Sequence, residues 1–363
     1  MKIVFFIGSI TGGGAERVVC DLADYLSVKG YDVEILVVTK TADSYLQNKN
    51  ILVSSLEDNV KIKLRLLKKV AKFNEINNYI KNHSVDVYIT FLPMTIISLL
   101  FFRKNIKNPV IISERNNPAS YNKIVQYLMI KAVQKADGIV FQTKNAAKFY
   151  CKSNRHIKDY VIIPNAIRNK YQIKTVTKRR KVIVAVGRLT AQKNYELLIS
   201  AFYEFQKKYG GYELEIYGEG KLESKLKKKT KKLKIDNKVH FKGFVKNVSD
   251  KIYDAEMYIL ASNYEGIPNS LIEAMSIGVP VISTNCDGGG AELLINNGVN
   301  GILIEKNNVE QMIKAMTYYI AYPEIAKKYS EAAKYSIRKF NPDVIYDRWE
   351  EYIKNYQGKK YEN

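Results

Sequence analysis

Residues 262–294 read SNYEGIPNSLIEAMSIGVPVISTNCDGGGAELL, and this stretch decides how the chain is interpreted. Its pattern predicts a loop over 262–269, a short helix over 270–277, a buried strand over 279–283 and a glycine-rich loop that begins a further helix. Helices and buried strands that alternate with short connections are typical of α/β proteins. The stretch therefore predicts part of an α/β domain with a polar loop at the end of one strand.

Two carboxylates bracket this loop and helix, Glu265 in the loop and Glu273 in the helix. We expect Asn269 or Ser270 to cap the helix, and the N–H groups of its first turn, which includes Leu271, to attract an anion such as a diphosphate. Glu273, expected in that first turn, can accept hydrogen bonds from hydroxyls but would repel a phosphate that it faced. The predicted ligand therefore carries both phosphate and hydroxyl groups.

The composition is that of an ordinary soluble globular chain with a large excess of basic residues. Its 363 residues are enough for two or three domains, and 46% of them are hydrophobic. There are 58 Lys and Arg residues against 36 Asp and Glu, a net charge of +22, which favours an anionic partner: nucleic acid, an anionic membrane or a phosphorylated small molecule. The chain is also rich in Lys, Asn, Ile and Tyr together, which an AT-rich genome produces without selection for charge.

Several classes of protein are disfavoured by the cysteines, the histidines and the apolar runs. Three widely spaced cysteines argue against a disulfide framework and favour a reducing compartment. The histidines share no metal-ligand spacing and no D-x-D motif occurs, so we expect no metal and no cofactor. The N-terminal MKIVFFIGSI is expected to form a strand, and the longest apolar run, 89–102, contains Pro93 and is shorter than the roughly 20 residues of a membrane span. We therefore expect no transmembrane segment.

Short apolar runs alternate with amphipathic stretches in two successive series, a pattern that predicts doubly wound parallel sheets. The first series of strands is expected at 3–7, 33–38, 85–91, 110–113, 139–142 and 161–163. The second is expected at 182–186, 213–217, 239–241, 257–261, 279–283 and 301–304. A polar, basic stretch from 168 to 181 separates the two series, which predicts domains over 1–168 and 178–338.

The Glu-x7-Glu arrangement in the context EGIPNSLIEAMSIGVPVIS resembles the donor-site signature of retaining glycosyltransferases of the GT-B fold, in particular glycosyltransferase family 4. The resemblance implies an α/β fold with two Rossmann-like doubly wound domains and a central cleft, and a C-terminal helix over 341–358 that packs back on the first domain. It implies that Glu265 contacts hydroxyls of the transferred sugar and that Glu273 binds the ribose of the nucleotide.

A second element of the predicted donor site follows the first strand of the second domain, where Gly187, Arg188 and Lys193 lie in the sequence GRLTAQKN. Two cations that leave a strand end together can hold one diphosphate and neutralise the leaving nucleotide. The element also resembles the GRL…QKN segment of family 4, which implies a catalytic role for Arg188 and Lys193.

Three further loops are candidates for the same ligand. Gly13 and Gly14 begin the first helix in the sequence GGGAER, which is not G-x-G-x-x-G, and no acid ends the second strand, so a dehydrogenase is disfavoured. The resemblance implies that this loop faces the donor phosphates or sugar, and that the loops with Gly218, Glu219 and Phe244 surround the base. Each glycine is also compatible with a plain turn.

Glu114 and Arg115 follow a strand of the first domain and are candidate donor or acceptor contacts. Many family members carry a histidine where this chain has Arg115. The change replaces a neutral imidazole with a fixed cation, which can bind a phosphate or serve the structure alone.

Residues 61–73, KIKLRLLKKVAKF, predict a basic amphipathic helix with Lys61, Arg65, Lys68 and Lys72 on one face. Such a helix can lie on an anionic membrane or bind a lipid diphosphate, or it can be an ordinary surface helix. The first 170 residues carry 26 basic and 13 acidic side chains, which modestly favours a membrane or lipid-diphosphate partner.

Together, these features predict a cytoplasmic enzyme, peripheral on the inner face of the membrane, that moves a sugar with retention from a nucleotide sugar, most simply a UDP-sugar, to a lipid-linked or saccharide acceptor. Arg188, Lys193 and the helix of the first stretch would neutralise the diphosphate without a metal. Two alternatives remain: a sugar-nucleotide epimerase of the same fold, and a basic nucleic-acid-binding protein, which would lack any recognised reading motif.

Overall fold

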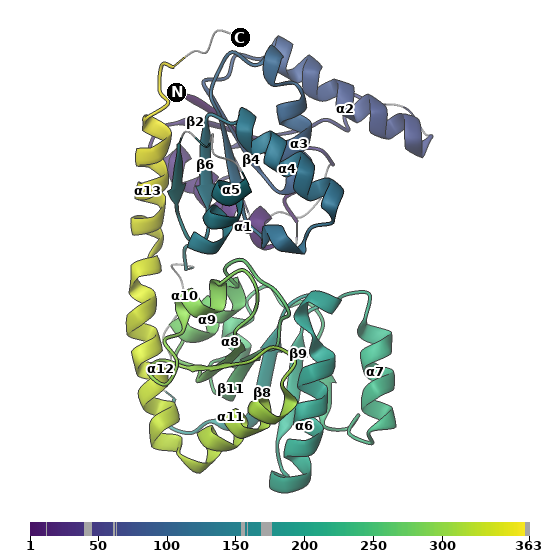
Figure 1. Ribbon diagram of the computed structural model, residues 1–363, viewed down its shortest axis with the longest axis vertical. Coiled ribbons are helices and arrows are strands. Elements are labelled where there is room, and N and C mark those ends of the chain that lie inside the picture. The colour runs from purple at the N-terminus through teal and green to yellow at the C-terminus, as the bar shows by residue number, and fades with distance from the viewer. Residues whose placement is uncertain are drawn as a thin grey trace. The chain divides into compact units, whose positions relative to one another are not determined.

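The computed structural model describes residues 1–11, 13–39, 46–60, 62, 64–153, 157, 159–167 and 176–359. The chain divides into two compact units (Figure 1). Unit 1 contains residues 1–166 and the C-terminal segment from Asp343, and unit 2 contains residues 167–342. Each unit is built on one parallel sheet, and each is described by itself.

The sheet of unit 1 has seven strands in the order β3-β2-β1-β4-β5-β6-β7, with every neighbouring pair parallel. Six of the strands match the predicted ones within two residues: β1 (Lys2–Ile7), β2 (Asp32–Val37), β4 (Val87–Phe91), β5 (Val110–Glu114), β6 (Gly138–Phe141) and β7 (Tyr160–Ile162). The sequence pattern missed β3 (Leu52–Ser55), an edge strand in which Leu52 is 59% exposed, because only two of its four residues are apolar.

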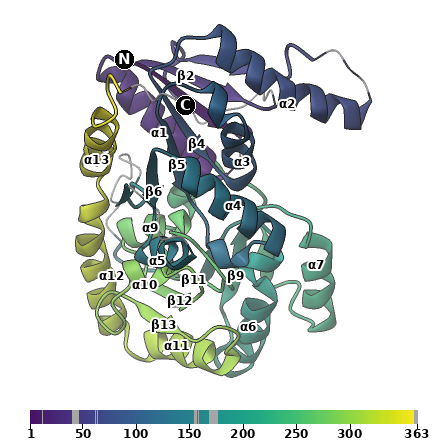
Figure 2. The same ribbon diagram turned by 45° about the horizontal axis from the view of Figure 1, so that its top comes forward.

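Helices cover both faces of this sheet, as a parallel sheet requires. They are α1 (Gly14–Val28), α2 (Arg65–Asn82), α3 (Pro93–Phe101), α4 (Lys123–Lys135), α5 (Lys144–Ser153) and α13 (Pro342–Lys354). Consecutive residues of β1 separate the two cores: Phe5 packs with Phe91 and with Trp349 of α13, whereas Phe6 packs with residues of α3, α4 and α5. Figure 2 shows α3 and α4 side by side, in agreement with their packing contacts.

The sheet of unit 2 has six parallel strands in the order β10-β9-β8-β11-β12-β13. All six were predicted: β8 (Arg180–Val186), β9 (Glu213–Tyr217), β10 (Val239–Phe241), β11 (Ala255–Leu260), β12 (Val281–Thr284) and β13 (Ile302–Ile304). β12 begins two residues later than expected, at Val281. The carbonyl of the preceding Pro280 accepts from the N–H of Tyr258, whereas a proline has no N–H to donate.

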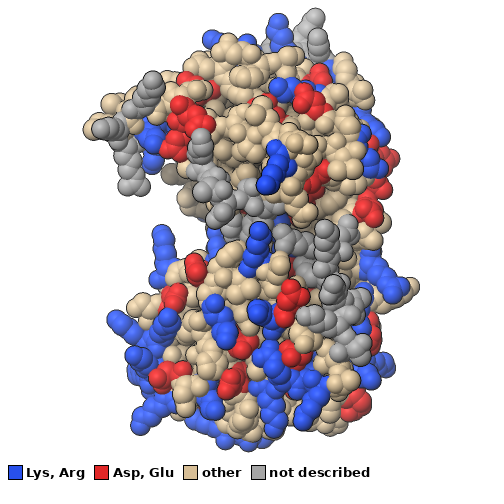
Figure 3. Space-filling model, turned by 180° about the vertical axis from the view of Figure 1, so that it is seen from behind, with Lys and Arg blue, Asp and Glu red and all other residues tan. Residues whose placement is uncertain are grey.

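Helices cover both faces of this sheet and form a buried core on each, and seven of them lie in the part of unit 2 that the structure describes. They are α6 (Tyr195–Tyr209), α7 (Glu223–Lys232), α8 (Ser249–Ile252), α9 (Asn269–Ser276), α10 (Gly290–Leu294), α11 (Val309–Ala321) and α12 (Pro323–Ile337). Phe202 and Phe205 of α6 are fully buried in one core, and Leu271 of α9 is fully buried in the other. Many Lys and Arg side chains cover the outside of this unit (Figure 3).

The start of α9 differs from the prediction. The helix begins at Asn269, its N-cap is Pro268, and no side chain caps it. The prediction that Asn269 or Ser270 caps the helix is therefore wrong, since both residues lie inside it and Ser270 Oγ instead accepts a hydrogen bond from Tyr258 at 2.8 Å. Glu273 consequently lies in the second turn and not in the first.

Candidate functional site

The loops that follow β8 and β11 are joined by hydrogen bonds. β8 and β11 are neighbours in the centre of the sheet, so their carboxyl ends meet at the same edge. The N–H of Asn263 donates to the carbonyl of Gln192 at 2.8 Å, and the Gln192 side chain donates to the carbonyl of Tyr264 at 3.0 Å. These bonds hold residues 191–194 against residues 263–265.

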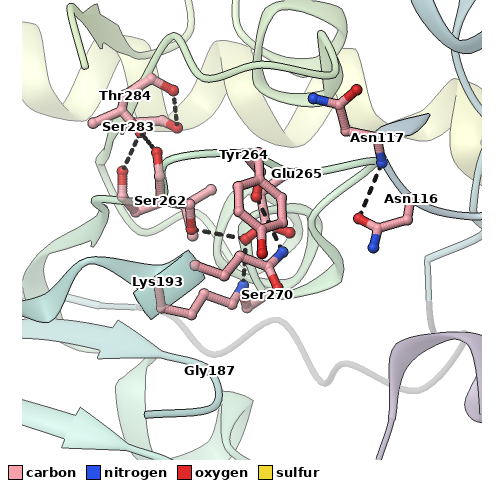
Figure 4. A network of polar contacts seen from close by, with 12 residues as sticks. Asn116, Asn117, Gly187, Lys193, Ser262, Tyr264, Glu265, Ser270, Ser283 and Thr284 are labelled. Atoms are coloured by element: carbon pink, nitrogen blue, oxygen red, sulfur yellow. Dashed lines mark hydrogen bonds and ion pairs between the residues drawn. The ribbon is translucent and has the colours of Figure 1, made fainter. Parts of the chain in front are cut away.

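Lys193 and Glu265 form an ion pair at this junction, with Nζ and Oε1 2.7 Å apart. The Ser262 hydroxyl donates to the same Glu265 oxygen, also at 2.7 Å (Figure 4). Glu265 is only 7% exposed and Ser262 is fully buried, so little water competes for these bonds. The structure thus brings together two of the three residues predicted to be catalytic, and it holds the carboxylate from two sides.

A close backbone contact lies beside this pair, at the ends of β8, β9 and β10. A Cβ atom at Gly187 would lie 2.7 Å from Cε of Lys193, and one at Gly218, where φ is +135°, would overlap the carbonyl oxygen of Gly187. The N–H of Gly218 donates to the carbonyl of Gly243 at 2.7 Å. We call Gly187, Gly218 and Gly243 the glycine edge. Close packing leaves no room for a side chain at Gly187 and Gly218, whereas Gly243 has space for one but a φ of +67°, which favours glycine.

Glu219 and Phe244 lie on the exposed side of the glycine edge. Oε1 of Glu219 accepts a hydrogen bond from the N–H of Phe244 at 3.3 Å, and the Phe244 ring is 57% exposed. The structure therefore brings these two predicted base contacts together. Arg188, on the loop after β8, is also exposed.

The N-terminus of α9 leads from the Glu265 loop into the core. Leu271 is fully buried, and Glu273 is only 7% exposed. The Tyr258 hydroxyl that donates to Ser270 stays protonated, because burial raises the pKa of Tyr258. With no side-chain cap, the first turn of α9 presents backbone N–H groups of the kind that bind anions.

Sequence reasoning missed two side chains that support the site. Ser262 lies three residues before Glu265, and its role follows from the fold of the loop after β11. Tyr195, at the start of α6, donates to the carbonyl of Gly187 at 2.9 Å and so supports the glycine edge. A serine three residues from a predicted catalytic acid is a signal that the sequence offered, whereas the Tyr195 contact depends on how α6 packs.

Comparisons with known proteins agree with this architecture. The family model described as Glycosyltransferase Family 4 matches residues 12–170, and the model described as Glycosyl transferases group 1 matches residues 166–336. The chain belongs to the glycosyltransferases. The predicted family is confirmed.

Relatives and solved structures extend the agreement over nearly the whole glycosyltransferase. An uncharacterized glycosyltransferase of Haemophilus influenzae is 28% identical over 96% of this chain and 98% of its own length. A Campylobacter jejuni α-1,4-N-acetyl-D-galactosaminyltransferase, named for a diphospho-undecaprenol-linked glycan, is 27% identical over 96% of this chain and 97% of its own. Anabaena HepE in complex with UDP-glucose has a TM-score of 0.83 at 16% identity, covering 98% of this chain and all of that one. The predicted GT-B fold is confirmed.

In unit 1 of the glycosyltransferase, Gly13 is the N-cap of α1 and Gly14 its first residue. The carboxylate of Glu16 lies so close to Gly13 that a Cβ atom there would overlap it. A carboxylate at a helix N-terminus favours hydroxyl ligands and repels a phosphate. Gly12 lies outside the described residues, and ligand contact by Gly13 and Gly14 stays a prediction.

Glu114, at the end of β5, is almost fully buried, and burial raises its pKa. Its Oε1 accepts from the Tyr121 hydroxyl at 2.7 Å and from the N–H of Asn116 at 3.0 Å, and its Oε2 accepts from the Tyr150 hydroxyl at 2.8 Å. In this arrangement both carboxylate oxygens are occupied within unit 1.

Arg115 points to the opposite face of the sheet, where its guanidinium lies 5.4 Å from the ring centre of Phe91 and 5.2 Å from that of Trp349. Nη1 donates to Asn165 at 3.1 Å, but Nε and Nη2 are buried with no partner among the described residues. Burial lowers the pKa of Arg115 to about 9, which leaves it a cation at neutral pH. Arg115 therefore joins β5 to α13, and its contact with a substrate stays a prediction.

The predicted basic helix is α2, which begins at Arg65 and runs to Asn82, so Lys61 precedes it and lies outside the described residues. Lys68 and Lys72 pair with Glu57, at 2.5 and 3.4 Å, so this part of the predicted basic face turns to a carboxylate. Apolar side chains are exposed near the start of α2 beside Lys69: Leu64, Leu67 and Val70 are each more than half exposed.

Two other kinds of feature are absent from the described residues. No group of three or more His, Cys, Asp or Glu side chains is placed to hold a metal ion there. In the same part of the chain, no helix has the length and the apolar character to cross a membrane.

Proposed function

We propose that this glycosyltransferase moves a sugar, with retention of configuration, from a UDP-sugar to a lipid-linked or saccharide acceptor in the assembly of a bacterial surface glycan. The observation that carries the proposal is the Lys193–Glu265–Ser262 cluster, which lies beside the glycine edge. The names of the Campylobacter relative and of the HepE complex support the acceptor class and the UDP-sugar.

The ion pair of Lys193 and Glu265 is the arrangement expected of a donor site before its ligand binds. Without ligand, each charge neutralises the other at 2.7 Å in a site that is largely closed to water. A nucleotide sugar carries both complements: its diphosphate can accept from Lys193, and its sugar hydroxyls can donate to Glu265. Binding would thus exchange one internal pair for two bonds to the ligand, with no charge left unpaired.

The other donor contacts follow from their places around this pair. Exposed Arg188 and the uncapped N-terminus of α9, through Asn269 and Ser270, would share the diphosphate charge. The predicted contact of Leu271 is less favourable, because its N–H already donates to the carbonyl of Pro268 at 3.1 Å. Glu273 would accept from the ribose hydroxyls. The loops with Gly218, Glu219 and Phe244 would surround the base. The acceptor hydroxyl would attack the anomeric carbon on the face from which the phosphate leaves, and its proton would pass to that phosphate as the sugar–phosphate bond breaks.

The proposal includes peripheral contact with an anionic membrane. The surface of α3 and α4 is better suited to this contact than that of α2. Met94 and Phe101 of α3 and Ile124 and Tyr127 of α4 are each at least 60% exposed. The two helices pack side by side, and Lys104, Lys107, Lys123 and Lys131 are exposed on or beside them. Glu114 is the one acid between residues 93 and 135, and it is buried. Apolar side chains flanked by cations are the features that attach a protein to an anionic membrane surface.

The experiment that tests the function measures release of the sugar from a panel of nucleotide sugars, with and without lipid-linked acceptors, for the wild type and Glu265→Gln. We expect one donor to be used and the variant to lose transfer. A chain that neither binds nor turns over any nucleotide sugar would contradict the proposal.

A further inference from the structure

The positive charge of unit 2 is concentrated in one segment. Residues 221–246 contain eleven lysines against two acids, Glu223 and Asp236. The whole region 171–363 carries 32 basic and 23 acidic side chains, so this segment alone accounts for its net charge of +9. A lysine bias of the genome would raise the charge everywhere, and it does not explain a balanced remainder.

The segment folds as α7, β10 and their flanking loops, and most of its lysines are exposed, whereas Lys229 turns inward and donates to the carbonyl of Glu196 at 2.8 Å. Leu226 and Thr230 attach α7 to the unit, because both are buried. Lys225 pairs with Glu196 and Lys227 with Glu223. Other exposed lysines pair with no carboxylate in the part of the chain that the structure describes: Lys228, Lys231, Lys232 and Lys246. We call these four the lysine surface. Lys231 and Lys232 lie three and four positions after Lys228 on α7, close enough for their like charges to repel one another unless an anion lies on them, and Lys246 follows β10, the next strand of the chain.

The segment that carries the lysine surface adjoins the candidate site within the same unit. Gly220 directly precedes residues 221–246 and lies against Leu189. A Cβ atom at Gly220 would lie 2.5 Å from the carbonyl oxygen of Leu189. The N–H of Leu222 donates to that same carbonyl at 3.0 Å. At the other end, Lys242 directly precedes Gly243 of the glycine edge. A long ligand on these lysines would therefore extend to the loops of the proposed donor site.

We propose that the lysine surface binds an acceptor polymer that carries negative charge in every repeat, as phosphodiester or uronate groups. The inference rests on the proposed function and specifies its acceptor. Such a chain can contact several lysines at once and release counterions from each. A membrane is a poorer occupant, because Phe244 is the one exposed large apolar side chain described between residues 222 and 248.

The test compares two fourfold variants that remove the same charge from unit 2. One changes Lys228, Lys231, Lys232 and Lys246 to Gln. The control changes Lys327, Lys328, Arg338 and Lys339 to Gln, all exposed on α12 or the turn that follows it. Thermal unfolding of both confirms the fold. Binding to poly(glycerol phosphate), to a polyuronate, to single-stranded RNA and to neutral dextran is then measured by fluorescence anisotropy between 50 and 300 mM salt, and binding to anionic vesicles by cosedimentation.

For the first variant, we expect at least a tenfold loss of affinity for one or both anionic polymers. The slope of log affinity against log salt should fall by about 3, since each neutralised charge contributes roughly 0.7. The control should bind each polymer with an affinity within threefold of that of the wild type. Neither variant should differ from the wild type in its binding to neutral dextran. The polymer that shows the loss identifies whether phosphodiester or uronate groups are bound.

Equal losses in both variants, or none, would overturn the inference. So would a loss confined to anionic vesicles or to single-stranded RNA, which would assign the surface to a membrane or to nucleic acid. Donor hydrolysis is measured separately on the same proteins. Its absence from the wild type would count against the proposed function, whereas intact hydrolysis with unchanged polymer binding would count against the lysine surface alone.

Discussion

Lys193 and Glu265 are separated by 72 positions in the sequence, yet their Nζ and Oε1 atoms lie 2.7 Å apart. The contact exists because β8 and β11 are adjacent and their loops are hydrogen-bonded to each other. In the proposed complex with a nucleotide sugar, Lys193 would bind the diphosphate and Glu265 would bind the sugar hydroxyls. The pair therefore links the fold of unit 2 to its proposed chemistry.

Glu265→Gln should lower kcat/KM for transfer by about 100-fold or more, because the carboxylate that orients the sugar is lost while the side chain keeps its size. Steady-state kinetics with the identified donor measures this effect. Ser262→Ala removes only one bond to the carboxylate and should cost less, about tenfold. A Glu265→Gln enzyme with near wild-type turnover would remove Glu265 from the mechanism.

Gly218→Ala should destabilise unit 2 by about 2–4 kcal/mol, because the added Cβ would overlap the carbonyl of Gly187 at a positive φ. Urea unfolding measures the change. Gly211→Ala is the matched control: its φ is +68° but the space around it is open, so it should cost only about 1 kcal/mol. Equal costs at both positions would show that the close contact at the glycine edge contributes nothing.

Arg115→Met should leave the free energy of unfolding within about 1 kcal/mol of the wild type, or raise it, because it fills the space between Phe91 and Trp349 and removes two unpaired donors. Arg115→Ala empties that space and should cost about 2–4 kcal/mol. A large loss with Met would indicate that the charge itself stabilises unit 1.

The same residue predicts a pH dependence. The folded pKa of Arg115, about 9, lies below its ordinary value of 12.5, so above about pH 9 the unfolded chain binds the proton that the folded chain releases. Stability of the wild type should therefore rise with pH in this window relative to Arg115→Met. Unfolding of both proteins at pH 8 and pH 10 measures the difference, and we expect a relative gain of about 1 kcal/mol for the wild type. A constant difference would contradict the lowered pKa.

The double variant Ile124→Ser and Tyr127→Ser should reduce binding to anionic vesicles by at least tenfold, since each buried apolar side chain contributes about 1.5–3 kcal/mol. Cosedimentation measures it. Val344→Ser on α13 is the control, because Val344 is 50% exposed but lies outside α3 and α4. Unchanged sedimentation of the double variant would exclude this surface as the membrane contact.

Most of the fold was predictable because the strands of parallel sheets are continuous apolar runs. β9 and β10 were predicted with their observed bounds. β3 was not, because only the first half of the exposed edge strand Leu52–Ser55 is apolar. The start of α9 was misplaced because Pro268 directly before the helix was a better signal than the polar residues that follow it.

The candidate site was predictable only as separate motifs. Residue type and resemblance selected Glu265, Lys193 and Gly218, but nothing in the sequence shows that the first two form an ion pair. The sequence also did not show that Lys68 and Lys72 pair with Glu57. Helical periodicity does not reveal this contact, because Glu57 lies in the loop before α2. Contacts between distant segments depend on packing, which local patterns do not encode.

The most direct measurement is calorimetric titration of UDP and of the preferred UDP-sugar into the wild type and Lys193→Met. If the diphosphate takes Lys193 from Glu265, the wild type should bind both ligands, and the variant should bind UDP at least tenfold more weakly while keeping its melting temperature within a few degrees. Equal affinity of the two proteins for UDP, or no nucleotide binding by the wild type, would contradict a donor site at Lys193 and Glu265.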